Sequence, residues 1–344
     1  MTTLFRSILD WVQSIIGNYG WSVIVFSLLI KCVLLPLDVK SRRSMRAMAA
    51  LNPKLEELKK RYANDQEKLN QKMSELYKKN GVNPLSGCLP MLIQLPILYI
   101  MFAAMRHACA SYQFEHLYAW ISQYLCDAEG NLLQLDAVQG VLEQLRSGDG
   151  LKMFGDTQSW LWIKSVFQPD TFGKTVIPTL SELTTMLSQY PDELEAVKMD
   201  LLSLYAADTN GIASAVDAAI SASCGYKSFY LFMSIGKITY PTNWSSYVNG
   251  YFILPVLAAV TQFLSTKLQP DAGNSTQSGS GKFMKWFFPI FSLWICLSST
   301  AAFAIYWVFV NVWSIVTSFA INKYLDRKTN KPNNSTTQKE ALQP

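Results

Sequence analysis

The sequence predicts an all-α polytopic membrane protein: a five-span core with a cytoplasmic helical hairpin and an enlarged extracytoplasmic insertion. Half of the 344 residues are hydrophobic and 16% are charged, whereas about 25% are charged in ordinary soluble domains. The apolar residues gather in long runs, as membrane-spanning helices require. The charges are segregated, because residues 40–84 hold twelve Lys and Arg against five Asp and Glu, and residues 108–249 hold fifteen acidic against seven basic residues.

Residues 1–18 are predicted to form an amphipathic helix that lies in the membrane interface. The stretch is too short to cross a bilayer, and an ordinary packed helix would show the same pattern. Its apolar residues recur at helical spacing: Leu4, Phe5, Ile8, Val12, Ile15 and Ile16. The first span follows at residues 19–39, which match the roughly 20 residues of one crossing.

Residues 40–84 are predicted to form a cytoplasmic helical hairpin with one apolar and one polar face. Two apolar sets recur at helical spacing on either side of "ANDQ": Leu51, Leu55, Leu58 and Tyr62, then Leu69, Met73, Leu76 and Tyr77. The second span is expected at residues 86–107. Pro90 and Pro96 lie inside it, which membrane helices tolerate because neighbouring helices satisfy the freed carbonyls.

The remaining chain is predicted to hold a soluble-type insertion and three more spans. Residues 108–249 lack any apolar run long enough to cross, and short helical patterns recur around 132–145 and 181–204. The third span is expected at residues 248–268, followed by a polar cytoplasmic linker at 269–282. The apolar run from 283 to 324 is about twice as long as one crossing needs. It therefore divides into a fourth span at 283–298 and a fifth at 301–324, before a polar cytoplasmic tail at 325–344.

Charge predicts the topology of these spans. The hairpin, the linker and the tail carry the excess of Lys and Arg, and the large insertion is acidic. The positive-inside rule therefore places the hairpin and the C-terminus in the cytoplasm, and the N-terminus outside.

Lys31 is the most informative single residue. It lies inside the first span, where a charge costs about 2.5–3.5 kcal/mol on insertion scales, and such residues usually serve a function. The alternative is that its long side chain extends to the cytoplasmic interface, about 12 Å along the helix. Ser27 lies one turn away on the same face, although its hydroxyl could equally bond to its own helix backbone.

The sequence offers no metal or catalytic site. The six cysteines lack paired C-x-x-C spacing, and the acidic region lacks a nucleophile–base arrangement, so an enzyme is not expected. Cys109, Cys126 and Cys224 fall in the polar middle, where two of them could pair, and the spacing does not select a pair.

Several segments together resemble the YidC/Oxa1/Alb3 family of membrane protein insertases. They are "IKCVLLPLDVKS", "NPLSGCLPMLIQLPILYIMF", "LWIKSVFQPD", "YFILPVLAAVTQF" and "MKWFFPIFSLWI…AAFAIYWVFVNVWSIV". They include all five predicted spans. The sequence departs from the family in two ways: the position of Lys31 is commonly arginine, and the insertion, especially 175–246, is larger than in a minimal member.

The resemblance implies an insertase and chaperone that passes substrate helices into lipid through a hydrophilic groove. The groove opens to the cytoplasm, is closed to the outside, and works alone or with the Sec translocon, without cofactors. Its expected lining is Lys31, Ser27, Gln94, Gln262, Tyr306, Trp307 and Asn311. For the two glutamines, hydrogen bonding between helices is the alternative, and for Tyr306 and Trp307 it is an interfacial aromatic belt.

The partners implied are nascent membrane proteins and membrane lipids, with no specific nucleic acid. The basic hairpin adds the ribosome and the Sec translocon as expected partners, and contact with anionic headgroups fits the same charges. The alternative function is a secondary transporter of small solutes, whose substrate site would also use intramembrane Lys and Gln. Such transporters usually show repeated halves, and no repeat is visible here.

Overall fold

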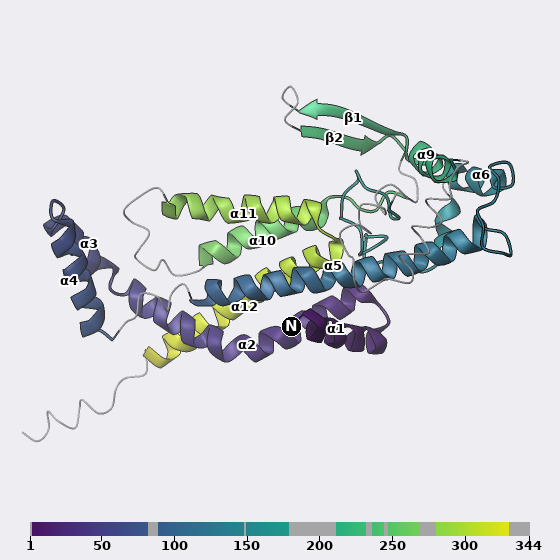
Figure 1. Cartoon of the computed structure of the whole chain (residues 1–344). Coiled ribbons are helices and arrows are strands. Elements are labelled where there is room, and N and C mark those ends of the chain that lie inside the picture. Colours follow the sequence, from purple (N-terminus) through teal and green to yellow (C-terminus); the bar gives the residue numbers. More distant parts are fainter. Residues whose placement is uncertain are drawn as a thin grey trace, which may run out of the picture. The chain divides into compact units, whose positions relative to one another are not determined.

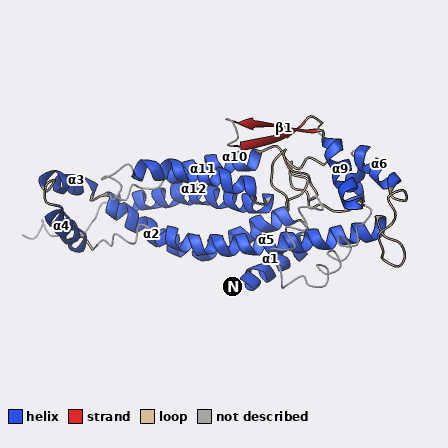
Figure 2. Cartoon of the chain, turned by 45° about the horizontal axis from the view of Figure 1, so that its top comes forward, coloured by secondary structure: helices blue, strands red, loops and turns tan. Residues whose placement is uncertain are grey.

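A computed structural model of the chain describes residues 2–81, 89–147, 149–178, 211–231, 236–243, 247–268 and 280–329. Helices make up most of this part of the chain, and two strands pair in a hairpin (Figures 1 and 2). The predominance of helix confirms the sequence-based fold class at this level.

The chain divides into two compact units. The first unit comprises Met1–Leu29, Leu95–Val260 and Pro289–Val308. The second comprises Ile30–Gln94, Thr261–Phe288 and Phe309–Pro344. Each unit therefore gathers segments that are far apart in the sequence.

Two helices in the described residues are long and apolar enough to cross a membrane, by length and composition. They are α2 (Tyr19–Ala49) and the Ala301–Tyr324 part of α12 (Ala301–Thr329). Shorter apolar helices are α10 (Ile253–Leu268), the Lys285–Ser298 part of α11 (Ser280–Ser298), and α9 (Ile212–Cys224). The five-span arrangement remains a prediction.

Two helices extend beyond the predicted spans. The 31 residues of α2 correspond to about 46 Å, which exceeds a hydrocarbon core of about 30 Å, so α2 continues into the segment predicted as the hairpin. Likewise α5 (Leu89–Tyr124) continues past residue 107 into the predicted insertion. In both places the sequence continues without a glycine or proline that would end the helix.

Helix α1 (Thr2–Ile16) has apolar residues on two sides. Leu9 and Val12 are buried, whereas Leu4, Trp11 and Ile15 are exposed. The buried side fits the packed-helix interpretation, and the exposed side is the one that could contact lipid. Its position in the membrane interface remains a prediction.

In the second unit, α3 (Asn52–Arg61) and α4 (Gln66–Lys79) are joined by a short turn. Leu55 of α3 and Tyr77 of α4 meet in a small cluster with Met48 of α2 and Leu51, which precedes α3. Asp65 begins α4, and its carboxylate accepts a hydrogen bond from the backbone N–H of Lys68 at 3.0 Å, which satisfies one free donor of the helix start.

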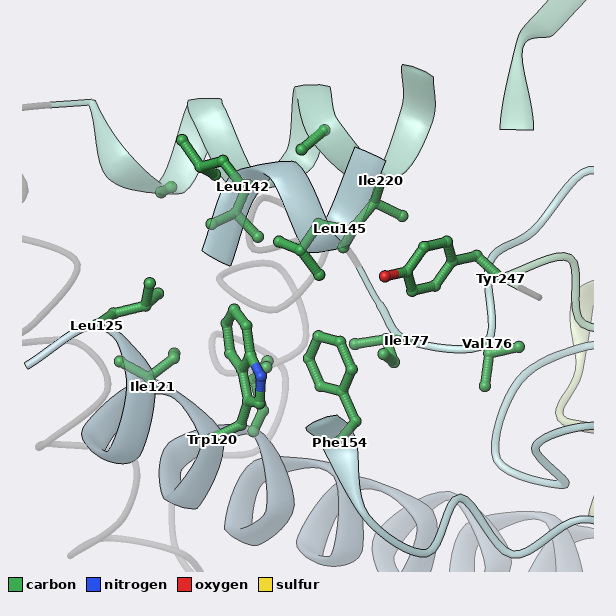
Figure 3. Close-up of a cluster of buried hydrophobic side chains, with 14 of the residues drawn as sticks. Trp120, Ile121, Leu125, Leu142, Leu145, Phe154, Val176, Ile177, Ile220 and Tyr247 are labelled. Carbon is green, nitrogen blue, oxygen red and sulfur yellow. The ribbon is translucent and has the colours of Figure 1, made fainter. Parts of the chain in front are cut away.

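The insertion has its own hydrophobic core in the first unit. The C-terminal part of α5 packs there with α6 (Gln139–Ser147), the 3-10 helix η2 (Asp149–Phe154) and α9. Trp120 stacks on Phe154 with ring centroids 4.4 Å apart, and Leu142, Leu145 and Ile220 lie around them (Figure 3). Of the helical patterns expected in the insertion, the one around 132–145 is helical only from Gln139, where α6 begins, and residues 132–138 are not helical. The pattern at 181–204 lies outside the described residues.

The sequence analysis did not predict a strand hairpin in the insertion. Strands β1 (Tyr226–Leu231) and β2 (Gly236–Pro241) pair antiparallel, with Tyr226 opposite Pro241 and Leu231 opposite Gly236. The segments "YKSFYL" and "GKITYP" are rich in aromatic and β-branched residues, which favour strands.

Candidate functional site

A charged stripe runs along α2 in the second unit. Asp38 and Arg42 follow Lys31 by 7 and 11 residues, which places all three on one face of the helix. Lys31 is 8% exposed, and Asp38 and Arg42 are the charged groups that act on it electrostatically. The structure thus shows that Lys31 is buried and adds a second buried cation, Arg42, on the same face of the helix. The role of Lys31 in a groove remains a prediction.

Arg42 is 7% exposed. Its Nη2 donates to the carbonyl oxygen of Ser314 at 3.1 Å and to the hydroxyl of Ser314 at 3.2 Å. Its Nη1 donates to the hydroxyl of Ser318. The guanidinium thus joins α2 to α12 within the second unit.

The sequence analysis did not single out Arg42, Ser314 or Ser318 as site residues. Arg42 follows the predicted end of the span, so it was counted among the charges of the hairpin. One signal was available in the sequence: the spacing of 11 residues from Lys31 predicts a shared helix face. The four-residue spacing of Ser314 and Ser318 likewise places their hydroxyls one turn apart.

Two further polar pairs link α10 with α12 in the second unit. The hydroxyl of Ser265 donates to that of Ser314 at 3.1 Å. The side-chain amide of Asn311, which is 7% exposed, donates to the hydroxyl of Thr261 at 3.4 Å. The predicted residue Asn311 therefore lies in the same unit as Lys31, within a set of polar side chains from three helices.

Gln262 also belongs to the second unit, on α10. Its side-chain amide donates to the hydroxyl of Thr266 at 3.4 Å, and Thr266 donates back to the backbone carbonyl of Gln262 at 2.9 Å. These bonds stay within one helix. Gln94 occupies a position on α5, and its side chain lies outside the described residues.

The other three predicted site residues belong to the first unit. Ser27 is fully buried and donates to the carbonyl of Val23 at 2.6 Å, as its alternative interpretation stated. Tyr306 is 2% exposed. Trp307 lies against Phe303, with ring centroids 5.7 Å apart, and its enclosed indole Nε1 has no acceptor among the described residues.

The first unit also contains a buried polar network that sequence analysis assigned only to a family motif. Asp170, with no exposed surface, ends the motif "LWIKSVFQPD". Its carboxylate accepts hydrogen bonds from the backbone N–H groups of Tyr251 and Leu254, at 2.9 and 2.6 Å, and from the indole of Trp162 at 3.2 Å. It therefore caps the start of α10.

The same motif holds the start of α12. The backbone N–H groups of Ala301 and Ala302 donate to the carbonyls of Gln168 and Val166, at 3.0 and 2.8 Å. Asn249 is also fully buried and bonds to three carbonyls: those of Ser165, Gln168 and Pro169. The loop is thus tied by hydrogen bonds to the first turns of two apolar helices.

Cys109, Cys126 and Cys224 are free thiols, as are Cys32 and Cys296. The described part of the chain therefore shows no disulfide in the insertion, which the sequence had left open. Nor does it group three or more His, Cys, Asp or Glu side chains as a metal site would require.

A family model matches most of the chain, whereas the curated relatives match about a third of it or less. The model of the family described as "60Kd inner membrane protein" matches residues 11–206 and 201–329. The membrane protein insertase YidC of Fusobacterium nucleatum is 48% identical over 99 residues, which are 29% of this chain and 48% of the relative. The YidC protein of Thioalkalivibrio sulfidiphilus is 45% identical over 95 residues, which are 28% of this chain and 17% of the relative. That of Campylobacter jejuni is 42% identical over 100 residues, which are 29% of this chain and 19% of the relative. The chain therefore matches about half, or less, of the length of these curated relatives.

Proposed function

The chain belongs to the 60 kDa inner membrane protein family, which is the YidC/Oxa1 family of insertases, and from that premise we propose that it is a membrane protein insertase and chaperone. A substrate helix slides into lipid along a hydrophilic groove while its polar flanking segment passes through the groove. The partners are nascent membrane proteins and lipids, and the protein acts alone or with the Sec translocon.

The observation that carries the proposal is the buried polar set of the second unit. Lys31 and Asn311 are each at most 8% exposed, and they lie on helices with long apolar stretches. Polar side chains in such helices are rare because they are costly, and they mark substrate pathways. In the proposed mechanism, polar substrate atoms pass along this set.

Lys31 supplies the attraction in this mechanism. A cation in a low-dielectric surround interacts strongly with charges over several ångströms. Acidic residues of an entering segment are drawn towards it, and the cost of taking their carboxylates out of bulk water falls. No covalent bond is formed or broken. The partition of the apolar substrate helix into lipid provides the driving force for insertion.

In the first unit, the buried side chains of Asp170 and Asn249 are hydrogen-bonded to backbone groups, and Asp170 also accepts from the indole of Trp162. A fully satisfied buried network is rigid. Trp307 also belongs to the proposed lining, and its buried indole Nε1 has no acceptor among the described residues. Ser27, Gln94, Gln262 and Tyr306 complete the proposed lining.

The charge distribution supports a multi-pass location in the plasma membrane, with the N-terminus outside and the C-terminus in the cytoplasm. The basic surfaces of α3 and α4 then face the cytoplasm, where they contact anionic headgroups and receive the ribosome or the Sec translocon.

The test is insertion into liposomes by the purified protein. A short single-span substrate should become integrated, as judged by protease protection of its translocated end, and empty liposomes should give the background. A secondary transporter, the alternative function, would move a small solute and leave the substrate protein accessible to protease. Absence of integration above background would refute the proposed function.

A further inference from the structure

The guanidinium of Arg42 is buried without a carboxylate at ion-pair distance among the described residues. Its hydrogen-bond partners are the hydroxyls of Ser314 and Ser318 and one backbone carbonyl, all on α12. Asp38, one turn earlier on α2, acts on it only electrostatically. Buried charges are usually paired with opposite charges, so this guanidinium is held by neutral groups where an anion would be the stronger partner.

The neutral partners are themselves well connected. The hydroxyl of Ser314 also receives a hydrogen bond from Ser265, and the hydroxyl of Ser318 donates to the carbonyl of Ser314 at 2.6 Å. If the guanidinium turned away, both serines would keep partners within the α10–α12 pair. Exchange of Arg42 from the serines to an incoming anion would therefore leave few polar groups unsatisfied, which keeps its cost low.

The position of Arg42 on α2 suggests which anion it meets. It lies on the same face as Lys31, about 16 Å further towards the helix end that continues to α3. In the proposed topology this end is cytoplasmic, so a segment that enters the groove passes Arg42 before it reaches Lys31.

We infer that Arg42 is a second specificity-determining residue of the groove, which binds carboxylates of an entering acidic segment in exchange for the hydroxyls of Ser314 and Ser318. The inference rests on the proposed insertase function and extends it. Arg42 and Lys31 then form two successive cationic positions, and an entering acidic segment meets Arg42 first and Lys31 second.

The chain provides a matched control for this inference. Arg43 is the next residue and carries the same charge, but it is exposed. The test compares Arg42→Gln with Arg43→Gln in liposomes, using two single-span substrates that differ only in two Asp or two Asn in the translocated segment. We expect Arg42→Gln to slow insertion of the Asp substrate about tenfold, the equivalent of one charge-assisted hydrogen bond. The Asn substrate should change less than about twofold, and Arg43→Gln should affect neither.

If Arg42→Gln slowed insertion of both substrates equally, Arg42 would only hold α2 to α12, and the inference would be overturned. No effect of Arg42→Gln on either substrate would also overturn it. Two more variants apply if Arg42→Gln does not fold. Arg42→Lys and the double variant Ser314→Ala with Ser318→Ala should both still insert the Asp substrate, because the cation remains. Loss of both substrates in the double variant would contradict this.

Lipid composition separates a headgroup site from a substrate site. The same variants are compared in vesicles of phosphatidylcholine alone and of phosphatidylcholine with phosphatidylglycerol. A defect of Arg42→Gln that follows the anionic lipid and not the Asp residues would overturn the inference. Insertion of the Asn substrate by the unsubstituted protein tests the proposed function separately, because that step does not depend on Arg42.

Discussion

At the scale of single residues, a charged side chain in an apolar helix is costly and therefore usually has a function. Lys31 is buried on α2, and its proposed role depends on charge more than on side-chain shape. We expect Lys31→Arg to keep activity, and Lys31→Ala and Lys31→Glu to lose insertion of substrates with acidic N-terminal segments. Complementation of insertase-depleted cells, with the amount of each variant checked, measures this. Normal insertion by the Ala and Glu variants would mean that Lys31 only extends to the interface.

Gly250 is required for a different reason, which is space. A Cβ at this position would lie 1.9 Å from Oδ1 of Asp170. Gly250→Ala should therefore displace the carboxylate from the start of α10 and lower the free energy of unfolding by about 1–3 kcal/mol, as overpacking does. Thermal unfolding in detergent measures the effect. Gly140→Ala is the control, because nothing lies within 4 Å of its added Cβ, and equal melting temperatures for the two variants would contradict the prediction.

At the scale of elements, α3 and α4 rest on little buried surface. The small cluster of Met48, Leu51, Leu55 and Tyr77 holds them together, whereas α12 has a nearly continuous buried stretch at its start. We expect amide hydrogen exchange to be faster over residues 52–79 than over α2 and α12, because few buried contacts oppose local opening. Equal protection would refute this weaker local stability.

The start of α4 depends on Asp65. Its hydrogen bonds with the backbone and side chain of Lys68 lower its pKa below the ordinary value. Stabilisation by this carboxylate is therefore complete above the pKa of the unfolded chain, and it is lost as the pH falls through the lower folded value. Asp65→Ala should speed hydrogen exchange of residues 66–69 severalfold at neutral pH. Asp65→Asn should retain most protection, because asparagine also caps helices; equal acceleration by both would contradict the role of the cap.

At the scale of the whole molecule, the hairpin β1–β2 is separable from the insertion core. Its two ends meet, because the N–H of Thr242 donates to the carbonyl of Gly225 at 3.3 Å. Replacement of residues 226–241 by a four-residue Gly-Ser linker should leave the fold and insertion intact. Removal of α9 should instead unfold the insertion, since Val216 and Ile220 belong to its core. Tryptophan fluorescence and liposome insertion check both, and loss of insertion in the folded hairpin deletion would make the hairpin a working part.

Local patterns in the sequence were sufficient for the helical class, the family resemblance and the position of Lys31 within an apolar run. Hydropathy periodicity and the position of a charge within an apolar run depend on neighbours within a few turns, so they are readable without a structure. The five spans, the topology and the groove lining remain predictions built on those patterns. The strand hairpin was missed because only helical patterns were sought in residues 108–249, although the segments of β1 and β2 are rich in aromatic and β-branched residues.

Only the tertiary structure decided which distant residues share a hydrogen bond. Arg42 meets Ser318 across 276 positions of sequence, and Asp170 caps a helix that begins more than 80 residues later. Neither partner can be chosen from composition, because serines and backbone N–H groups occur throughout the chain. The sequence determined that a cation lies within the apolar run of α2, since both are read directly from the residues. The packing of α2, α10 and α12 determined that a second cation is buried with it and held by hydroxyl groups.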